Sequence, residues 1–244
     1  MKRSTHAWLS LGGLLLGLYA CGSEEGSDFV PFDQVDQDAG HVADSTVPPS
    51  DVINPAPPCE PGFITQVVGP AQDTEGNPIP LYGSFSGFGQ DRYPGIIFGP
   101  PQGAGDYMGS LDVLTLGMGG EIIVGFGNEG IADGEGADFI VFENVLYETG
   151  DPNKPYAEVA EISVSADLQT WHTFPCASEG LPYTGCAGWH AVFAHPDNGI
   201  SPFDPETAGG DAFDLAELNV TDARYVRIRD LDNPGFGGKT AGFD

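Results

Sequence analysis

From residue 59 onward, the chain alternates short apolar runs with clusters of Gly, Pro, Asn and Asp. A helical period is not sustained beyond about two turns in any run, and Asp214 to Asn219 is the best candidate for those. Many short strands with turn residues between them indicate an all-β sandwich or barrel. The runs, in order, are FITQVV, GIIFG, LDVLTL, EIIVGFG, DFIVFEN, AEVAEISVS, TWHTF, WHAVFA, DLAEL and ARYVRIRDL.

Several of these runs predict more than a strand. EIIVGF and DFIVFE are apolar without a break, which is typical of strands in the middle of a sandwich. ARYVRIRD alternates, so Val226 and Ile228 should face the core while the arginines point outward to carboxylates. EISVSADLQTWHTF predicts a hairpin with Ile162 and Val164 inward and a turn over Asp167 to Gln169.

Residues 1–58 predict an export segment and a tether rather than a folded domain. Residues 1–20 place Lys2 and Arg3 before an apolar run that is short for a membrane span, as in a signal peptide. Residues 21–58 carry eight acidic residues, no Lys or Arg and many prolines, which predicts a disordered tether. Residues 59–244 then form one β-sandwich domain of 186 residues.

The end of the export segment, LYAC, resembles the bacterial lipobox, in which cleavage precedes a cysteine that becomes lipidated. The resemblance implies that Cys21 carries lipid and anchors the chain at the bacterial outer membrane or cell surface. The alternative is an ordinary signal peptide with Cys21 a plain thiol.

The chain is strongly acidic, because it has 36 Asp and Glu residues and only eight Lys and Arg residues, for a net charge of −28. Loss of Lys2 and Arg3 with residues 1–20 makes it −30. A nucleic-acid partner is excluded, since phosphate binding needs clustered basic residues. The excess of carboxylates suits calcium, although solubility alone is an equal explanation.

The remaining cysteines have an exported compartment in which to pair. Cys176 and Cys186 enclose a short loop, and we expect a disulfide between them. Cys59 is then left as a free thiol or an intermolecular partner, and its pairing with either of the other two stays open.

Two resemblances extend this interpretation. ISVSADLQTWHTF and ARYVRIRD resemble paired strands of discoidin-type, galactose-binding-like jelly-roll domains. Most of residues 85–244 is similar to exported cell-surface lipoproteins of myxobacteria and their relatives, in segments such as FGQDRYPGIIFGPP, IADGEGADFIVFEN and DPETAGGDAFDLAEL. The second resemblance implies an eight- or nine-stranded sandwich outside the cell and no assigned chemistry. Relatives continue into a final strand after the position of Asp244, so that strand is missing here or a sheet edge is unpaired.

The segment DGEGADFIVFEN concentrates carboxylates around a glycine-rich turn. Asp133, Glu135 and Asp138 are spaced so that their oxygens could converge on one ion, without the pattern of an EF-hand. The loop from Gly209 to Asp214 is a second contributor, through Asp211 and Asp214. The alternative is that these residues are solvated or cap turns.

Catalysis is disfavoured, and we predict that the protein is not an enzyme. Glu143 and Asp138 are the carboxylates closest to a hydrolytic pair, but five residues apart on a strand they face opposite sides of the sheet. His190 and His195 likewise lie on opposite faces, and neither they nor His172 have zinc-like spacing. Tyr183 and Trp189, beside the expected disulfide, are candidates for stacking on a sugar, or else cover a small satellite core.

Together these features predict a lipid-anchored, calcium-stabilised surface module that recognises a glycan or another envelope component. Two alternatives remain. One is a structural envelope or matrix protein without a small ligand, and the other, less favoured, is an enzyme acting on polysaccharide.

Overall fold

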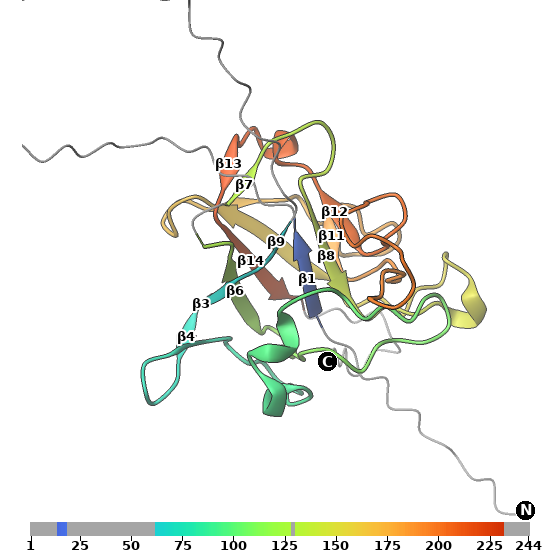
Figure 1. Cartoon of the computed structure of the whole chain (residues 1–244), viewed down its shortest axis with the longest axis horizontal. Coiled ribbons are helices and arrows are strands. Elements are labelled where there is room, and N and C mark those ends of the chain that lie inside the picture. The colour runs from blue at the N-terminus through green and yellow to red at the C-terminus, as the bar shows by residue number, and fades with distance from the viewer. Residues whose placement is uncertain (1–13, 19–61, 128–129, 232–244) are drawn as a thin grey trace, which may run out of the picture.

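The computed structural model describes residues 14–18, 62–127 and 130–231. Most of the regular structure in these ranges is antiparallel β-strand, and the helical elements are four short 3₁₀ turns (Figure 1). The predicted all-β class is therefore confirmed.

One main sheet has the strand order β12-β8-β1-β2. Its centre is β8, whose residues Phe139 to Glu143 are all buried. The strands are β1 (Leu14–Leu18), β2 (Gly62–Phe63), β8 (Phe139–Glu143) and β12 (Asp211–Phe213).

The second main sheet has the order β10-β9-β14-β6-β3, and β11 also pairs with β9. In its middle, β14 pairs along six residues of β9 and along five residues of β6. The strands are β3 (Gln66–Gly69), β6 (Glu121–Gly125), β9 (Ala160–Ser165), β10 (His172–Thr173), β11 (Cys186–Ala187) and β14 (Tyr225–Asp230).

Short elements complete the described fold. Two small ladders join β4 (Ala71–Gln72) to β5 (Pro78–Ile79) and β7 (Ile131–Ala132) to β13 (Asp222–Ala223). The 3₁₀ turns are η1 (Gln90–Arg92), η2 (Gly95–Ile97), η3 (Glu148–Gly150) and η4 (Leu215–Leu218).

The main hydrophobic core combines residues from both main sheets. Phe139 and Val141 of β8 belong to the same buried cluster as Ile162 of β9 and Val226 and Ile228 of β14. Ile140 and Phe142 belong instead to a second cluster with residues of the 192–208 segment. Because side chains alternate along a strand, β8 is buried on both faces, and this explains its unbroken apolar run.

The alternating run at the C-terminal end of the described chain is confirmed. Val226 and Ile228 are fully buried, while Arg227 and Arg229 lie outward. Arg229 reaches Glu161 at 3.9 Å, as expected. Arg227 instead lies over the ring of Trp171, with its guanidinium carbon 4.6 Å from the ring centroid.

The predicted hairpin is also confirmed, since β9 pairs antiparallel with β10 across the turn. Ile162 and Val164 are fully buried. The Asp167 carboxylate accepts hydrogen bonds from the backbone N–H groups of Gln169 and Thr170, which fixes the turn.

Other short runs differ from the strand prediction. The GIIFG run forms the 3₁₀ turn η2, and WHAVFA makes only an isolated bridge between Val192 and Gly209. Each run is buried only in part, at Ile96 and Ile97 in the first and at Ala191, Val192 and Ala194 in the second, whereas Phe98 and Phe193 are exposed. Their apolar residues therefore indicated partial burial but not the backbone form. The helical candidate at Asp214 to Asn219 is η4, a single 3₁₀ turn capped by the Asp214 side chain.

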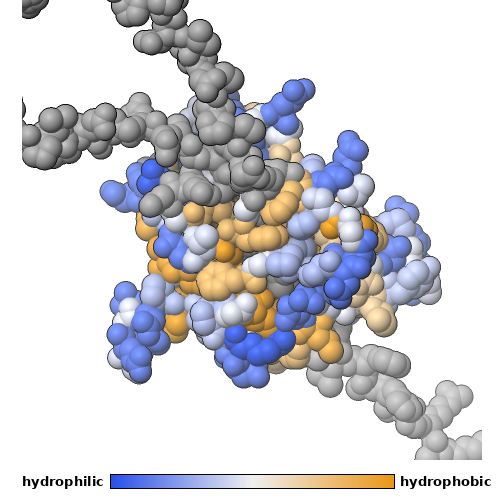
Figure 2. Space-filling model, viewed as in Figure 1, coloured by the Kyte–Doolittle hydropathy of each residue, from blue (hydrophilic) through white to orange (hydrophobic). Residues whose placement is uncertain are grey.

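Several predictions fall outside the described residues. These are the tether at 21–58, the lipidated Cys21 and the role of Cys59. Within the predicted export segment, Leu14–Leu18 is described and forms β1. No helix in the described ranges is long and apolar enough to cross a membrane. Figure 2 shows apolar residues gathered in the middle of one face, with hydrophilic side chains projecting from its rim.

Candidate functional site

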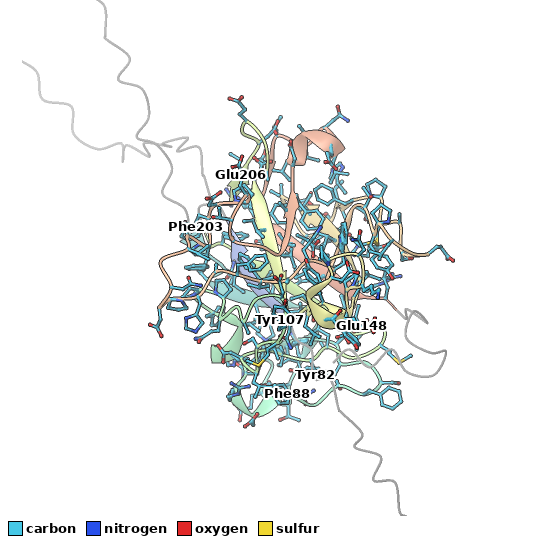
Figure 3. The ribbon with its side chains drawn as sticks, turned by 90° about the vertical axis from the view of Figure 1, so that its right-hand side faces the viewer. Tyr82, Phe88, Tyr107, Glu148, Phe203 and Glu206 are labelled. Carbon is cyan, nitrogen blue, oxygen red and sulfur yellow. A yellow bond between two sulfur atoms is a disulfide. The ribbon has the colours of Figure 1, made fainter. Side chains whose placement is uncertain are left out.

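A cavity of about 490 Å³ lies beside β11 and β12. Its floor is the segment from Gly209 to Phe213, and Tyr147, Trp189, His190 and Glu206 are among the residues of its wall. Glu206 comes from the same loop as Phe203, and Figure 3 shows both at one side of the molecule. This volume is within the range of cavities that bind small ligands.

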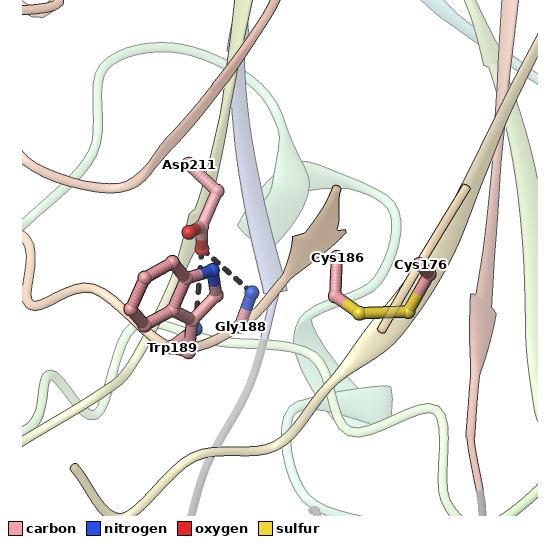
Figure 4. Close-up of a disulfide and its surroundings, with 5 residues drawn as sticks. All are labelled: Cys176, Cys186, Gly188, Trp189 and Asp211. Carbon is pink, nitrogen blue, oxygen red and sulfur yellow. Dashed lines mark hydrogen bonds between the residues drawn. A yellow bond between two sulfur atoms is a disulfide. The ribbon is translucent and has the colours of Figure 1, made fainter. Parts of the chain in front are cut away.

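The buried carboxylate of Asp211 organises one wall of this cavity. Its Oδ2 accepts hydrogen bonds from the backbone N–H groups of Gly188, at 2.7 Å, and Trp189, at 3.1 Å (Figure 4). Its Oδ1 lies 2.7 Å from Nδ1 of His190. Asp211 therefore ties the start of β12 to the chain that follows the disulfide.

The pairing with Asp211 orients His190. An ionised Asp211 favours the tautomer with the proton on Nδ1, which leaves Nε2 as the acceptor of the imidazole. The His190 side chain is 44% exposed and lines the cavity, whereas the Asp211 side chain is only 4% exposed. Burial raises the pKa of Asp211, and the hydrogen bond from His190 opposes that rise.

Aromatic rings extend the same wall. The ring of Trp189 lies against that of His190, with centroids 3.6 Å apart, and meets Tyr183 edge to face at 6.2 Å. Trp189 lines the cavity, while Tyr183 packs beside Trp189. The structure thus brings the two predicted aromatic ligand residues together, but only Trp189 lines the cavity.

The predicted disulfide between Cys176 and Cys186 is present, so this prediction is confirmed. Cys186 opens β11, which pairs with β9, and the cavity wall begins at Thr184. Figure 4 shows the disulfide on the same stretch of chain as Gly188 and Trp189. The cross-link therefore anchors the loop that carries the aromatic wall to the second main sheet.

A separate acidic cluster forms where the 133–138 turn meets the end of β12. Oxygens of Asp133, Asp138 and Asp214 all lie within 4.8 Å of one another. Donor oxygens around one calcium ion, each about 2.3–2.6 Å from it, span similar distances. Of the five predicted ligands, Glu135 and Asp211 are outside this cluster, and Asp211 belongs to the cavity wall instead.

Asp138 already has a structural role in this cluster. Its two oxygens accept hydrogen bonds at 2.7 Å from the backbone N–H groups of Gly134 and Leu215. Burial raises the pKa of Asp138, and the nearby charges of Asp214 and Asp133 raise it further. A bound cation would offset that repulsion, and calcium would take its remaining oxygen ligands from carbonyls or water.

The carboxylates considered for hydrolysis do not share a cavity in the described chain. Glu143 lines a cavity of only about 20 Å³, which has room for one water, and Asp138 is not among its lining residues. His195 is also separate from His190, because it lines a different cavity, of about 210 Å³, and does not line the cavity of His190. Its Nδ1 accepts a hydrogen bond from the backbone N–H of Asp197.

The pairing of His190 with Asp211 was not predicted from the sequence. The two residues are 21 positions apart, and neither occurs in a motif that links them. The nearest signal was the WH pair that follows the disulfide loop, combined with an Asp directly after two glycines.

Comparison with family models, with curated proteins and with solved structures gives no match to this chain. Function is therefore inferred from the geometry of the cavity and from the sequence features.

Proposed function

We propose that this protein is an exported, lipid-anchored module of the bacterial cell surface that binds carbohydrate in the cavity beside β11 and β12. The observation that carries the proposal is a ligand-sized cavity walled by Trp189 and by a His190 that Asp211 holds in place. The scaffold is a β-sandwich of jelly-roll type, as the sequence resemblance implies.

The composition of the wall supports a sugar as the ligand. Sugars bind through an apolar ring face that stacks on an aromatic side chain and through hydroxyls that need fixed polar partners. Trp189 supplies the aromatic surface, and Nε2 of His190 supplies an oriented acceptor. Glu206 and Glu217 add carboxylates that accept hydrogen bonds from hydroxyls.

The charge of the wall narrows the class of sugar. Carboxylates line the cavity and no Lys or Arg does, so a uronic acid or a sulfated sugar would meet like charge. Neutral sugars and amino sugars avoid that repulsion. We therefore propose a neutral or amino sugar within a surface or extracellular glycan.

The proposed cell-surface location is supported by sequence features and by the disulfide. The apolar segment before Cys21, the acidic tether and the disulfide each suit an exported, lipid-anchored chain. The lipid would be the only contact of the protein with the membrane.

A binding experiment tests the carbohydrate. An array of neutral, amino, uronic and sulfated glycans should give binding to the first two classes only. Trp189→Ala should weaken that binding at least about tenfold, as expected of a central aromatic contact. Trp171→Ala is the matched control, because Trp171 stacks on Arg227 and does not line the cavity. Absence of binding to any glycan, or equal loss in both variants, would contradict the proposal.

We also propose that the cluster of Asp133, Asp138 and Asp214 binds calcium and stabilises the loops at this end of the sandwich. Millimolar calcium should raise the melting temperature, and a chelator should reverse the effect. Asp133→Asn should abolish the calcium effect without disturbing the core, because Asp133 is exposed. Glu135→Gln, on the same turn but outside the cluster, should retain it. If calcium did not change the melting temperature, the metal site would be contradicted.

A further inference from the structure

The apolar N-terminal segment occupies an interior position in one main sheet. In β1, Leu14 to Leu18 run antiparallel to β8, with Leu14 opposite Glu143 and Leu18 opposite Phe139. On its other side β1 pairs with β2, where Gly17 lies opposite Phe63. Figure 1 shows β1 within the body of the domain, next to β8.

The buried strand β8 needs a pairing partner at the position that β1 occupies. All five residues of β8 are buried, and β12 pairs with only three of them, on the opposite side from β1. Without a strand at the β1 position, β8 would present unpaired backbone groups at the edge of a buried strand. Such groups are costly to leave unpaired, and an apolar edge of this kind attracts another strand.

The same residues lie inside the segment that the sequence predicts to be removed on export. Processing before Cys21 would take β1 away with residues 1–20 and leave the position beside β8 open. We propose that this position is an acceptor groove for an apolar strand, filled by Leu14–Leu18 in the unprocessed chain and by an apolar strand of another polypeptide after processing. This inference rests on the proposed export, and it is independent of the carbohydrate site.

The chain between Cys21 and Asp244 offers no obvious replacement. Neither residues 22–58 nor residues 232–244 contain five consecutive residues made only of aliphatic side chains and glycine, as LLLGL is. The long apolar runs of β6, β8 and β9 already have places in the two sheets. The replacement strand is therefore expected from outside this part of the chain.

The register defines the chemistry of that strand. It should be uncharged over about five residues, because β8 is buried on both faces and a charge there would be desolvated. A small residue is expected at the position of Gly17, which lies between Ile140 of β8 and Phe63 of β2. Recognition would combine backbone pairing with apolar side chains, as in other cases of strand addition to a sheet.

A peptide-exchange experiment on the full chain tests the groove. A specific protease site inserted within residues 22–58 allows the chain to be cut between β1 and the rest of the domain after folding. Both fragments stay in the solution. The N-terminal fragment should co-elute with the domain, and an excess of labelled peptide covering residues 11–20, with lysines added for solubility, should replace it.

The matched control is the same peptide with Leu16→Pro. Proline removes a backbone donor and does not fit an interior strand, while the peptide stays apolar. This peptide should replace the fragment at least about tenfold less well than the parent peptide does. Equal replacement by both peptides, or immediate loss of the fragment with no binding of either, would overturn the groove.

A second measurement tests the processed form and the source of the strand. In bacteria that express this sequence, the mass of the protein purified from membranes should show the loss of residues 1–20 and the addition of lipid to Cys21. The parent peptide at about 100 times its Kd should raise the melting temperature of this form by about 5–10 °C. A mass that retains residues 1–20 would place the strand in the same chain and overturn a second polypeptide as its source. Failure of glycan binding would leave these results unaffected.

Discussion

The carboxylate of Asp211 lies 2.7 Å from Nδ1 of His190 and also accepts the backbone N–H groups of Gly188 and Trp189. Through this one buried side chain, the first residue of β12 is joined to three consecutive residues, Gly188, Trp189 and His190. Without this carboxylate, the backbone N–H groups of Gly188 and Trp189 would lose the acceptor that they have in the structure.

Asp211→Asn should therefore destabilise the protein by about 1–3 kcal/mol. The amide side chain has only one acceptor oxygen, so its NH₂ group must face a donor or leave an N–H group without its partner. Urea unfolding, followed by tryptophan fluorescence, measures the change. Asp197→Asn is the control, because the Asp197 side chain is 91% exposed, and it should have little effect. Equal effects in the two variants would contradict the structural role of Asp211.

The contribution of Asp211 to the free energy of unfolding should change with pH in a predictable direction. Burial raises the pKa of Asp211 above its usual value of 3.8, so the folded chain binds this proton more tightly than the unfolded chain does. Between pH 3.8 and the raised pKa, the free energy of unfolding contributed by Asp211 falls as the pH rises, and it is constant above that pKa.

Because asparagine does not titrate, the stability difference between the wild type and Asp211→Asn should shrink as the pH rises through this window. Urea titrations at several pH values from about 3 to 7 measure it. A difference that grows with pH would mean that the hydrogen bonds from His190 and the backbone outweigh burial, and that the pKa of Asp211 is lowered.

The strands of this protein could be predicted where the pattern of apolar residues follows the pattern of burial. Val226 and Ile228 alternate with arginines, and Phe139 to Phe142 form a run that only a strand buried on both faces needs. The short spacing of Cys176 and Cys186 likewise made their disulfide predictable. Each of these signals is local in the sequence.

The candidate site was predictable only in part, because its residues come from distant segments. Asp211 and Asp214 were predicted in one ion site, yet they begin and follow the three-residue strand β12. An odd spacing along a strand sends side chains to opposite sides, so Asp211 joins His190 while Asp214 joins Asp133. The sequence alone did not reveal which side of β12 faces the wall. The position of β1 was also missed, because its apolar run predicted an export segment.

The disulfide should contribute to stability through the unfolded chain. Cys176 and Cys186 are 10 residues apart, and closing a loop of this size is expected to stabilise the folded state by about 2–3 kcal/mol. The double variant Cys176→Ala/Cys186→Ala should lose that amount in urea unfolding. A reductant should lower the stability of the wild type and leave the double variant unchanged. If the reductant left the free energy of unfolding of the wild type unchanged, this contribution of the disulfide would be contradicted.

Gly188 and Gly136 offer a matched test of how closely the cavity wall is packed. Both have a positive φ, 86° at Gly188 and 89° at Gly136, in the region that side chains disfavour. A Cβ at Gly136 would have nothing within 4 Å, whereas a Cβ at Gly188 would lie 1.8 Å from the carbonyl oxygen of Glu158. Gly188 also donates its N–H to Asp211 and accepts from the N–H of Glu158.

Gly136→Ala should therefore cost about 1–2 kcal/mol, from backbone conformation alone. Gly188→Ala should cost more than about 4 kcal/mol, because backbone must move and two hydrogen bonds are disturbed. Urea midpoints compare the two variants, and the soluble fraction on expression replaces them if Gly188→Ala does not fold. Similar losses in both would mean that the chain after the disulfide can shift freely, and a wall so easily displaced would not hold Trp189 and His190 against a ligand.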